Sequence, residues 1–167
     1  MALNKILIDE LRKEAASTRK ILECVPVDKN EWVPHDKSMK LGRLATHVAE
    51  LTGWVYLTLA TDELDFAKFT YKPVMPESVK DLLDKHDELV AQALSILENT
   101  TDEEFEKPWT MRAGEMIYFT IPKKDALRTY AYNHLYHHRG QLSVYLRLLD
   151  VHVPGMYGPS ADDRMVQ

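Results

Sequence analysis

The sequence has few of the features that mark secreted, membrane or redox-active proteins. Cys24 is the only cysteine among 167 residues, which excludes an internal disulfide and a thiolate metal cluster. No apolar stretch reaches the roughly 18 residues that a membrane-spanning helix needs. The opening segment "MALNKILIDELRK" carries acidic side chains where a secretory signal would be apolar. We therefore expect a cytoplasmic protein with no membrane partner.

Positive charge is also in short supply. The 21 lysines and arginines are outnumbered by 26 aspartates and glutamates, for a net charge of -5, and they form no basic run. Because clustered positive charge dominates binding to phosphate backbones, we expect no nucleic-acid partner. The apolar fraction of 45% is ordinary for a folded globular chain. The length fits a single domain, which we place at residues 1–167.

Apolar residues recur at three- and four-residue spacing in four long segments, which predicts amphipathic helices. These segments cover residues 3–24, 38–60, 79–97 and 123–150. Ser38 has a side chain suited to capping the start of the second segment. Four helices of comparable length predict an all-α fold, a four-helix bundle. The connection between helices three and four is long and irregular, and two β-prone runs around Ala113 and Gly114 in "WTMRAGEMIYFTI" predict a small hairpin there.

Three of the seven histidines crowd into the fourth predicted helix, in "NHLYHHRGQ". At about 100° per residue, His134 and His138 lie about 40° apart within the apolar stripe, whereas His137 falls at its edge. The opposite side is predicted to face solvent. It carries Arg128, Tyr132, Tyr136, Arg139, Ser143 and Arg147.

Two imidazoles buried side by side are costly unless their ring nitrogens find partners. A shared metal ion would satisfy both, and histidines at i and i+4 have this geometry. Leu135 follows the first histidine, so the glutamate of the zincin motif is absent. A third ligand should come from another helix, and the spacing does not choose between His47 and His86. The alternative for each histidine is an ordinary core residue bonded to a carbonyl or carboxylate.

Three segments of the sequence resemble the DinB-like family, and the resemblance covers nearly the whole chain. They are "LGRLATHVAEL", "KPWTMRAGE" and "NHLYHHRGQLSVYLRLLDVHVPGMYGPSAD". The resemblance implies a four-helix bundle that holds one divalent cation with His47 from the second helix and His134 and His138 from the fourth. It also implies a homodimer. His86 departs from the family pattern, where this position is commonly apolar, and it could line the pocket, add a ligand or simply pack.

A site of three imidazoles leaves a coordination position open, as catalytic metal sites do. Zinc or nickel is the expected cation, with iron or manganese as alternatives. Such an ion can activate water for hydrolysis or bind a thiol, and related families imply a low-molecular-weight thiol as cosubstrate. We expect a metal-dependent enzyme that acts on a small-molecule substrate, with thiol-dependent S-transfer ahead of hydrolysis. The competing interpretation is a non-catalytic, metal-stabilised dimeric bundle.

Several neighbours of the predicted site have side chains that could assist it. The second ring nitrogen of each ligand needs a partner, for which nearby polar residues are available. These are Glu50, Asn133 and Gln141. Aromatic and imidazole side chains near the histidines are candidates for the pocket wall, with core packing as the alternative. These are Trp54, Tyr130, Tyr145 and His86.

Overall fold

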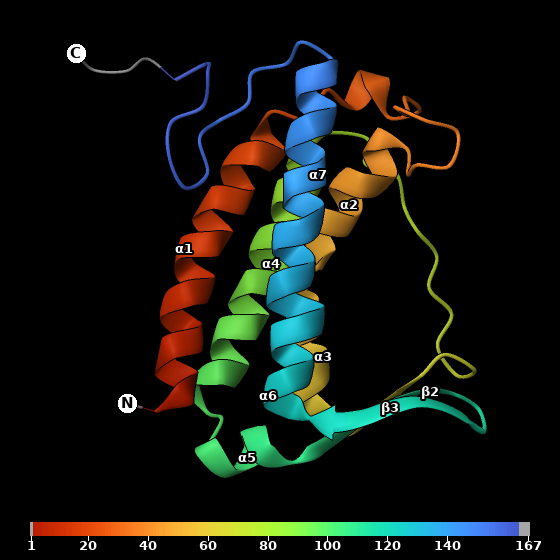
Figure 1. Cartoon of the computed structure of the whole chain (residues 1–167), viewed down its shortest axis with the longest axis vertical. Helices are drawn as coiled ribbons and strands as arrows, with labels where there is room; N and C mark the ends of the chain where they lie inside the picture. Colours follow the sequence, from red (N-terminus) through yellow and green to blue (C-terminus); the bar gives the residue numbers. More distant parts are fainter. Residues whose placement is uncertain (1, 164–167) are drawn as a thin grey trace.

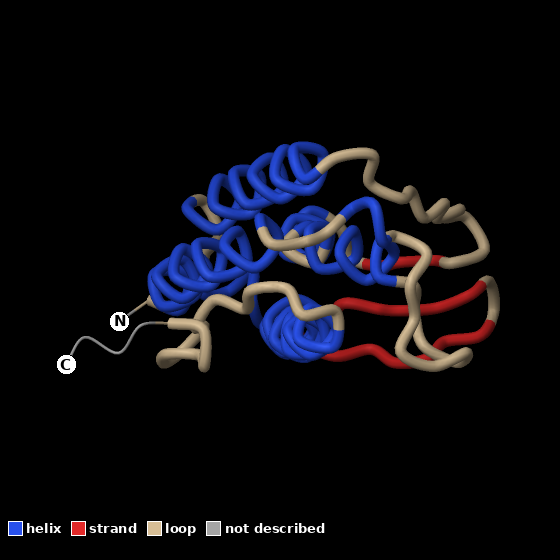
Figure 2. The backbone as a smooth tube through the Cα atoms, turned by 90° about the horizontal axis from the view of Figure 1, so that it is seen from above, coloured by secondary structure: helices blue, strands red, loops and turns tan. Residues whose placement is uncertain are grey.

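The computed structural model describes residues 2–163, in which a group of long helices stands beside a small sheet (Figures 1 and 2). The helical elements are α1 (Leu3–Glu23), η1 (Val27–Lys29), α2 (Leu41–Glu50), α3 (Gly53–Ala60), α4 (Val79–Glu98), α5 (Asp102–Glu106), α6 (Lys123–Ala126), η2 (Leu127–Asn133) and α7 (His134–Leu148). The strands are β1 (Glu63–Asp65), β2 (Pro108–Ala113) and β3 (Met116–Pro122). Residue 1 and residues 164–167 of the predicted domain lie outside the described residues.

The prediction of an all-α four-helix bundle was wrong, because a three-stranded mixed sheet accompanies the helices. The predicted hairpin around Ala113 and Gly114 is present: β2 and β3 pair in antiparallel fashion, and Gly114 takes a φ of 57° in the turn. The additional strand, β1, pairs with β2 in parallel fashion and completes the order β1-β2-β3. β1 has only three residues, too few to show the alternation that predicts a strand from sequence.

The predicted helices are present, but the second one is divided. It begins at Leu41 instead of Ser38, because the backbone N–H of Leu41 donates to the Trp32 carbonyl and holds the preceding loop out of the helix. A turn at Leu51 and Thr52 then separates α2 from α3, which begins at Gly53, a poor helix former. A Cβ at Gly53 would lie 3.2 Å from the Leu89 side chain, so the glycine permits close packing of α3 on α4. None of the helices within residues 2–163 is both long and apolar enough to cross a membrane.

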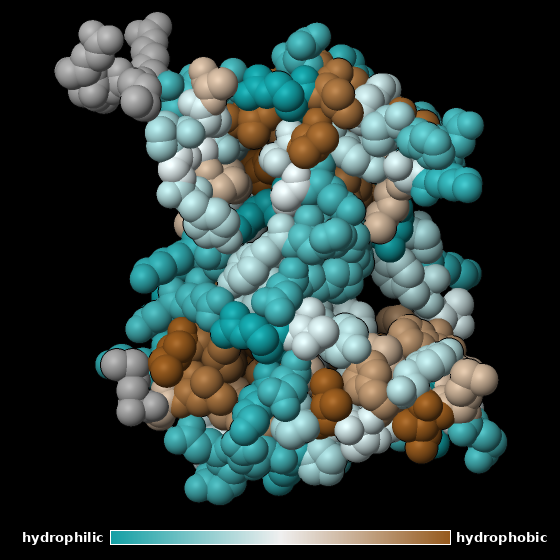
Figure 3. All heavy atoms as spheres, in the orientation of Figure 1, coloured by the Kyte–Doolittle hydropathy of each residue, from teal (hydrophilic) through white to brown (hydrophobic). Residues whose placement is uncertain are grey.

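The helices bury their apolar faces in a core that runs from α1 and α4 to α2 and α7. Trp109 of β2 is fully buried and joins the sheet to this core, with its ring centroid 6.4 Å from that of Trp54 in α3. The connection between β1 and α4 runs up one side of the helices as a long loop, yellow to green in Figure 1. In Figure 3, hydrophobic residues come to the surface at both the upper and the lower end of the molecule, and some of the lower ones lie on the side of the strands. The sheet and this loop therefore flank the helices on one side.

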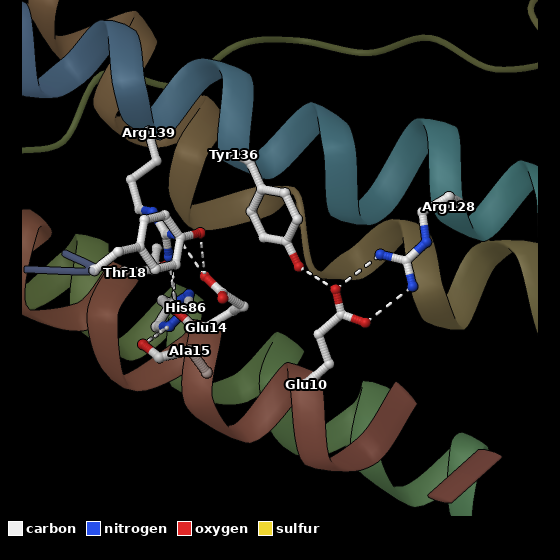
Figure 4. Close-up of polar contacts among 9 residues, drawn as sticks. Glu10, Glu14, Ala15, Thr18, His86, Arg128, Tyr136 and Arg139 are labelled. Atoms are coloured by element: carbon white, nitrogen blue, oxygen red, sulfur yellow. Dashed lines mark hydrogen bonds and ion pairs between the residues drawn. The ribbon is translucent and has the colours of Figure 1, made fainter. Parts of the chain in front are cut away.

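The face of the fourth helix that was predicted to be solvated is instead packed against α1 over much of its length (Figure 4). Tyr132 and Arg139 are each only 2% exposed. Arg139 donates to the Glu14 carboxylate at 2.5 Å, to the Thr18 hydroxyl at 3.0 Å and to the Glu14 carbonyl at 3.1 Å. The prediction failed because each helix of a bundle has two neighbours, and polar side chains can be buried between them when their hydrogen bonds are satisfied.

A second polar contact between these helices predicts how stability changes with acid. Arg128 donates two hydrogen bonds to Glu10, which lowers the pKa of Glu10 below its ordinary value of 4.5; burial opposes this shift and the Tyr136 hydroxyl adds to it. Since the folded-state pKa is the lower one, Glu10 stabilises the fold above pH 4.5, and this stability is lost as the pH falls further. Below that pH, the free energy of unfolding measured in urea should fall less for Glu10→Gln than for wild type. The matched control is Glu98→Gln, an exposed carboxylate, and equal slopes for the two variants would contradict the assignment.

Candidate metal centre

Three histidines from two helices converge on one point between α2 and α7. One ring nitrogen from each of His47, His134 and His138 lies within 4.8 Å of the other two, so that the three could hold a metal ion. The Nε2 atoms of His47 and His134 are 3.3 Å apart. The ring centroids of the three residues are separated by 4.6 to 5.0 Å. The structure thus brings the predicted set together.

The remaining ring nitrogens of the two α7 histidines are held by hydrogen bonds that fix their tautomers. His134 Nδ1 lies 3.3 Å from the Tyr130 carbonyl, and His138 Nδ1 lies 2.7 Å from Gln141 Oε1. Both partners are acceptors, so each Nδ1 carries the proton and each Nε2 keeps its lone pair. Such contacts orient metal-binding imidazoles in known sites. The donor set therefore fits a divalent cation.

Burial keeps all three rings in the neutral form that binds metal. It lowers the pKa of His47 to about 3, with further contributions from His138, His134 and Arg43. Burial is also the main cause of the lowered pKa of His134 and of His138. Near neutral pH the three rings are thus uncharged, and each has one ring nitrogen whose lone pair can bind a cation.

The backbone directly before His134 is π-helical, and one of its carbonyls contacts the His134 ring. Residues Leu127–Asn133 form a π-helical segment, η2, and the backbone N–H of His134 donates to Ala131. The Tyr130 carbonyl is thereby available to the imidazole of His134, as the 3.3 Å contact shows. π-Helical segments are rare and are frequently found at functional sites. The sequence periodicity gave no sign of this segment.

A cleft of about 280 Å³ lies beside His47, between α2, α3, β1 and the loop that follows β1. Its lining residues are Arg43, His47, Glu50, Gly53, Trp54, Leu57, Leu64, Phe66, Phe69 and Tyr71. A more open hollow on the other side of His134 is lined by Thr129, Tyr130, Asn133, His134 and His137. The ring of Tyr130 stacks on Trp54 with centroids 6.0 Å apart. Trp54 thus lines the cleft and Tyr130 lines the open hollow.

Two other predicted pocket residues lie elsewhere. His86 is 1% exposed and its Nε2 lies 3.1 Å from the Ala15 carbonyl of α1, which makes it a core histidine. Tyr145 packs edge-on against Trp32, with ring centroids 5.5 Å apart, and its hydroxyl donates to the Met39 carbonyl. Both residues contribute to packing between segments of the chain.

Of the polar residues proposed as partners for the candidate ligands, one contacts a histidine of the site and two lie elsewhere. Gln141 holds His138 through its oxygen, and its amide nitrogen lies 3.0 Å from Nε2 of the exposed His137. Glu50 instead accepts a hydrogen bond from the Tyr71 hydroxyl at 2.6 Å, and Asn133 lines the open hollow. His137 thus lies outside the triad, as its position on the helix predicted.

Sequence reasoning missed Arg43 and the aromatic wall formed by Phe66, Phe69 and Tyr71. Arg43 could have been found, because it lies four residues before His47 and so shares its face of α2. The wall comes from a segment with no helical or strand periodicity. Its one signal is the concentration of aromatic residues in "DFAKFTYK".

Fold and site together define a helical protein with three converging histidines and an attached small sheet. The DinB family model matches residues 2–165, and the chain belongs to the DinB family. A DinB-like protein from Bacillus cereus has a similar structure, with a TM-score of 0.67, 23% identity, and coverage of 89% of this chain and 94% of the other. A DinB-like protein from Bacillus subtilis is also similar, with a TM-score of 0.66, 18% identity, and coverage of 95% of this chain and 98% of the other. No curated protein matches the chain.

Proposed function

We propose that the protein is a divalent-metal-dependent enzyme that acts on a small molecule, with thiol-dependent S-transfer as the leading reaction and hydrolysis as the alternative. The observation that carries the proposal is the convergence of three neutral histidines next to a ligand-sized cleft. His47, His134 and His138 would hold the ion, for which imidazole donors favour zinc or nickel over iron or manganese. When bound, the ion supplies Lewis acidity that activates water or a thiol.

The residues around the triad support catalysis over a purely structural site. A fourth protein ligand would favour the structural alternative, and His86 was the candidate for that place. His86 instead contacts the Ala15 carbonyl, on the α1 side of the bundle. The apolar side chains of Trp54, Leu57 and Leu64 would limit the water near the reacting atoms.

The proposal is tested by turnover of 1-chloro-2,4-dinitrobenzene with a panel of thiols: bacillithiol, coenzyme A, cysteine and glutathione. In this reaction the thiol sulfur bonds to the ring carbon, chloride leaves with the bonding electrons, and the thiol proton passes to solvent. We expect turnover with at least one thiol, its loss with a chelator, and its return with zinc or nickel. Thiol-independent, chelator-sensitive hydrolysis of 4-nitrophenyl acetate would identify the alternative reaction. Turnover that a chelator leaves unchanged would overturn the metal-dependent proposal.

The proposal includes a homodimer. Val144 and Leu148 lie one turn apart on α7 and are 55% and 58% exposed, which leaves an apolar strip on that helix. Light scattering coupled to size exclusion should give twice the 19.3 kDa mass of the chain. A mass of one chain at micromolar concentration would contradict this part of the proposal.

Gln141 offers a test of how the ligands are oriented. Because its oxygen accepts the Nδ1 proton of His138, Gln141→Leu should weaken metal binding roughly 10- to 100-fold, the range found for such outer partners. Competition with a chromophoric chelator would measure the change. Gln92→Leu, on the exposed face of α4, is the matched control and should bind metal as wild type does. Equal affinity in the two variants would remove Gln141 from the site.

A further inference from the structure

We propose that the cleft beside His47 binds a small molecule with an apolar body and a carboxylate, and that Arg43 binds the carboxylate. The inference deepens the proposed function, on which it rests, by naming the substrate class. It depends on a cleft that joins one arginine to a set of apolar walls.

Arg43 is held at the cleft with part of its hydrogen-bonding capacity unused. Its Nη1 atom is buried and has no hydrogen-bond partner among the described residues. None of the ion pairs within residues 2–163 includes Arg43. Its Cζ atom lies 5.1 Å from the centre of the Tyr71 ring, a cation–π contact. A buried donor left without a partner costs free energy, which an acceptor in the cleft would recover once the side chain turns Nη1 toward it.

The position of Arg43 places an anion next to the candidate metal centre. Arg43 and His47 are four residues apart on α2, so their side chains project from the same face of the helix. Both line the same cleft. A guanidinium binds a carboxylate through two parallel hydrogen bonds, a geometry that also fixes the orientation of the rest of the molecule. A carboxylate on Arg43 would therefore hold the ligand beside His47.

The rest of the cleft selects an apolar body. Trp54, Leu57, Leu64, Phe66 and Phe69 supply most of the wall. The volume of about 280 Å³ lies just below the range of roughly 300–1,000 Å³ for ligand pockets, which suits one aromatic ring with a short chain.

The other charged residue of the cleft does not compete for this role. Glu50 is the one carboxylate among the lining residues, and its Oε2 already accepts a hydrogen bond from the Tyr71 hydroxyl. A divalent ion at the three neutral histidines would add positive charge next to Arg43 and favour an anionic ligand further. Glu50 keeps its negative charge when it accepts this hydrogen bond and offsets the charge of Arg43 in the absence of the ion, so the preference for a carboxylate rests on the paired hydrogen bonds of the guanidinium.

The test compares three probes of one shape: 3-phenylpropionate, the neutral 3-phenylpropanamide and the cationic 3-phenylpropylamine. Binding is followed by the NMR shift of the Trp54 indole N–H, which is assigned with Trp54→Phe. We expect wild-type protein to bind the anion roughly tenfold more tightly than the amide, because hydrogen bonds to charged groups are the stronger ones. The amine should bind most weakly. Equal affinity for the anion and the amide would overturn the proposal without any variant.

Variants then assign the preference to Arg43. Arg43→Gln should bind the amide as wild type does but lose the preference for the anion, and Arg43→Lys should keep part of it. The amide reports that the cleft is intact in each variant. Arg12→Gln is the matched control, since Arg12 is exposed on α1 and should leave the preference unchanged. A preference for the anion that survives in Arg43→Gln would overturn the role of Arg43.

Failure of this inference and failure of the proposed function are distinguishable. The probes are measured in protein treated with a chelator and again after addition of zinc. A preference for the anion that depends on Arg43 in chelated protein supports the inference even if no turnover is found. Preference for the anion that appears only with zinc and persists in Arg43→Gln would place the carboxylate at the metal centre and overturn the inference.

Discussion

Replacement of His134 by alanine should abolish binding of a divalent ion, which we expect wild-type protein to bind at about one per chain. Three neutral imidazoles supply the whole donor set in the described structure, and removal of one leaves a pair that holds a divalent ion poorly. The loss of affinity should exceed the roughly 10- to 100-fold effect of losing an outer partner such as Gln141. Elemental analysis of the purified protein measures the occupancy, and titration with zinc measures the affinity.

His137→Ala is the matched control for this experiment. His137 lies three residues further along the same helix turn, but it is exposed and stands outside the group of converging nitrogens. Its contact with Gln141 is lost in the variant, and the Gln141 contact with His138 remains available. The control should therefore keep its metal. Full occupancy in His134→Ala, or an equal loss in His137→Ala, would show that the ion does not bind at the triad.

The two candidate ligands on α7 could be predicted from the sequence because both lie on one helix. Their separation depends only on the residue spacing along that helix, and the spacing of four brings His134 and His138 onto one face. The third ligand depends on how two helices pack, which no local pattern encodes. His47 and His86 both lie on inward faces of their helices. The Nε2 atom of His47 lies 3.3 Å from that of His134, whereas His86 faces α1. Only the family resemblance distinguished them.

The parts of the fold that sequence reasoning missed depend on contacts between distant segments. β1 exists as a strand through its pairing with β2, more than forty residues away, and its three residues have no pattern of their own. The burial of Arg139 likewise depends on α1, which supplies Glu14 and Thr18 as partners. Hydrophobic periodicity treats an arginine as solvated because it cannot include partners that come from another helix.

Replacement of Arg139 by alanine should reduce the free energy of unfolding by about 3–5 kcal/mol, since it leaves a buried carboxylate without its partner. The side chains of Arg139 and Glu14 are only 3% and 12% exposed, so solvent screens this ion pair little. The same guanidinium also bonds Thr18 of α1 and the hydroxyl of Tyr157 in the C-terminal segment. The substitution therefore breaks contacts from α7 to two other parts of the chain. Urea unfolding followed by circular dichroism measures the loss.

Arg147→Ala is the matched control, because it removes an exposed arginine from the same helix. Arg147 pairs with Asp162 at 2.7 Å, but its side chain is 48% exposed, and exposed pairs contribute about 0–1 kcal/mol. A double-mutant cycle with Glu14→Ala then isolates the ion pair: if Arg139 acts through Glu14, the double variant should lose much less than the sum of the two single losses. Additive losses, or an Arg139→Ala variant no less stable than Arg147→Ala, would show that the buried contact does not stabilise the packing of α7 on α1.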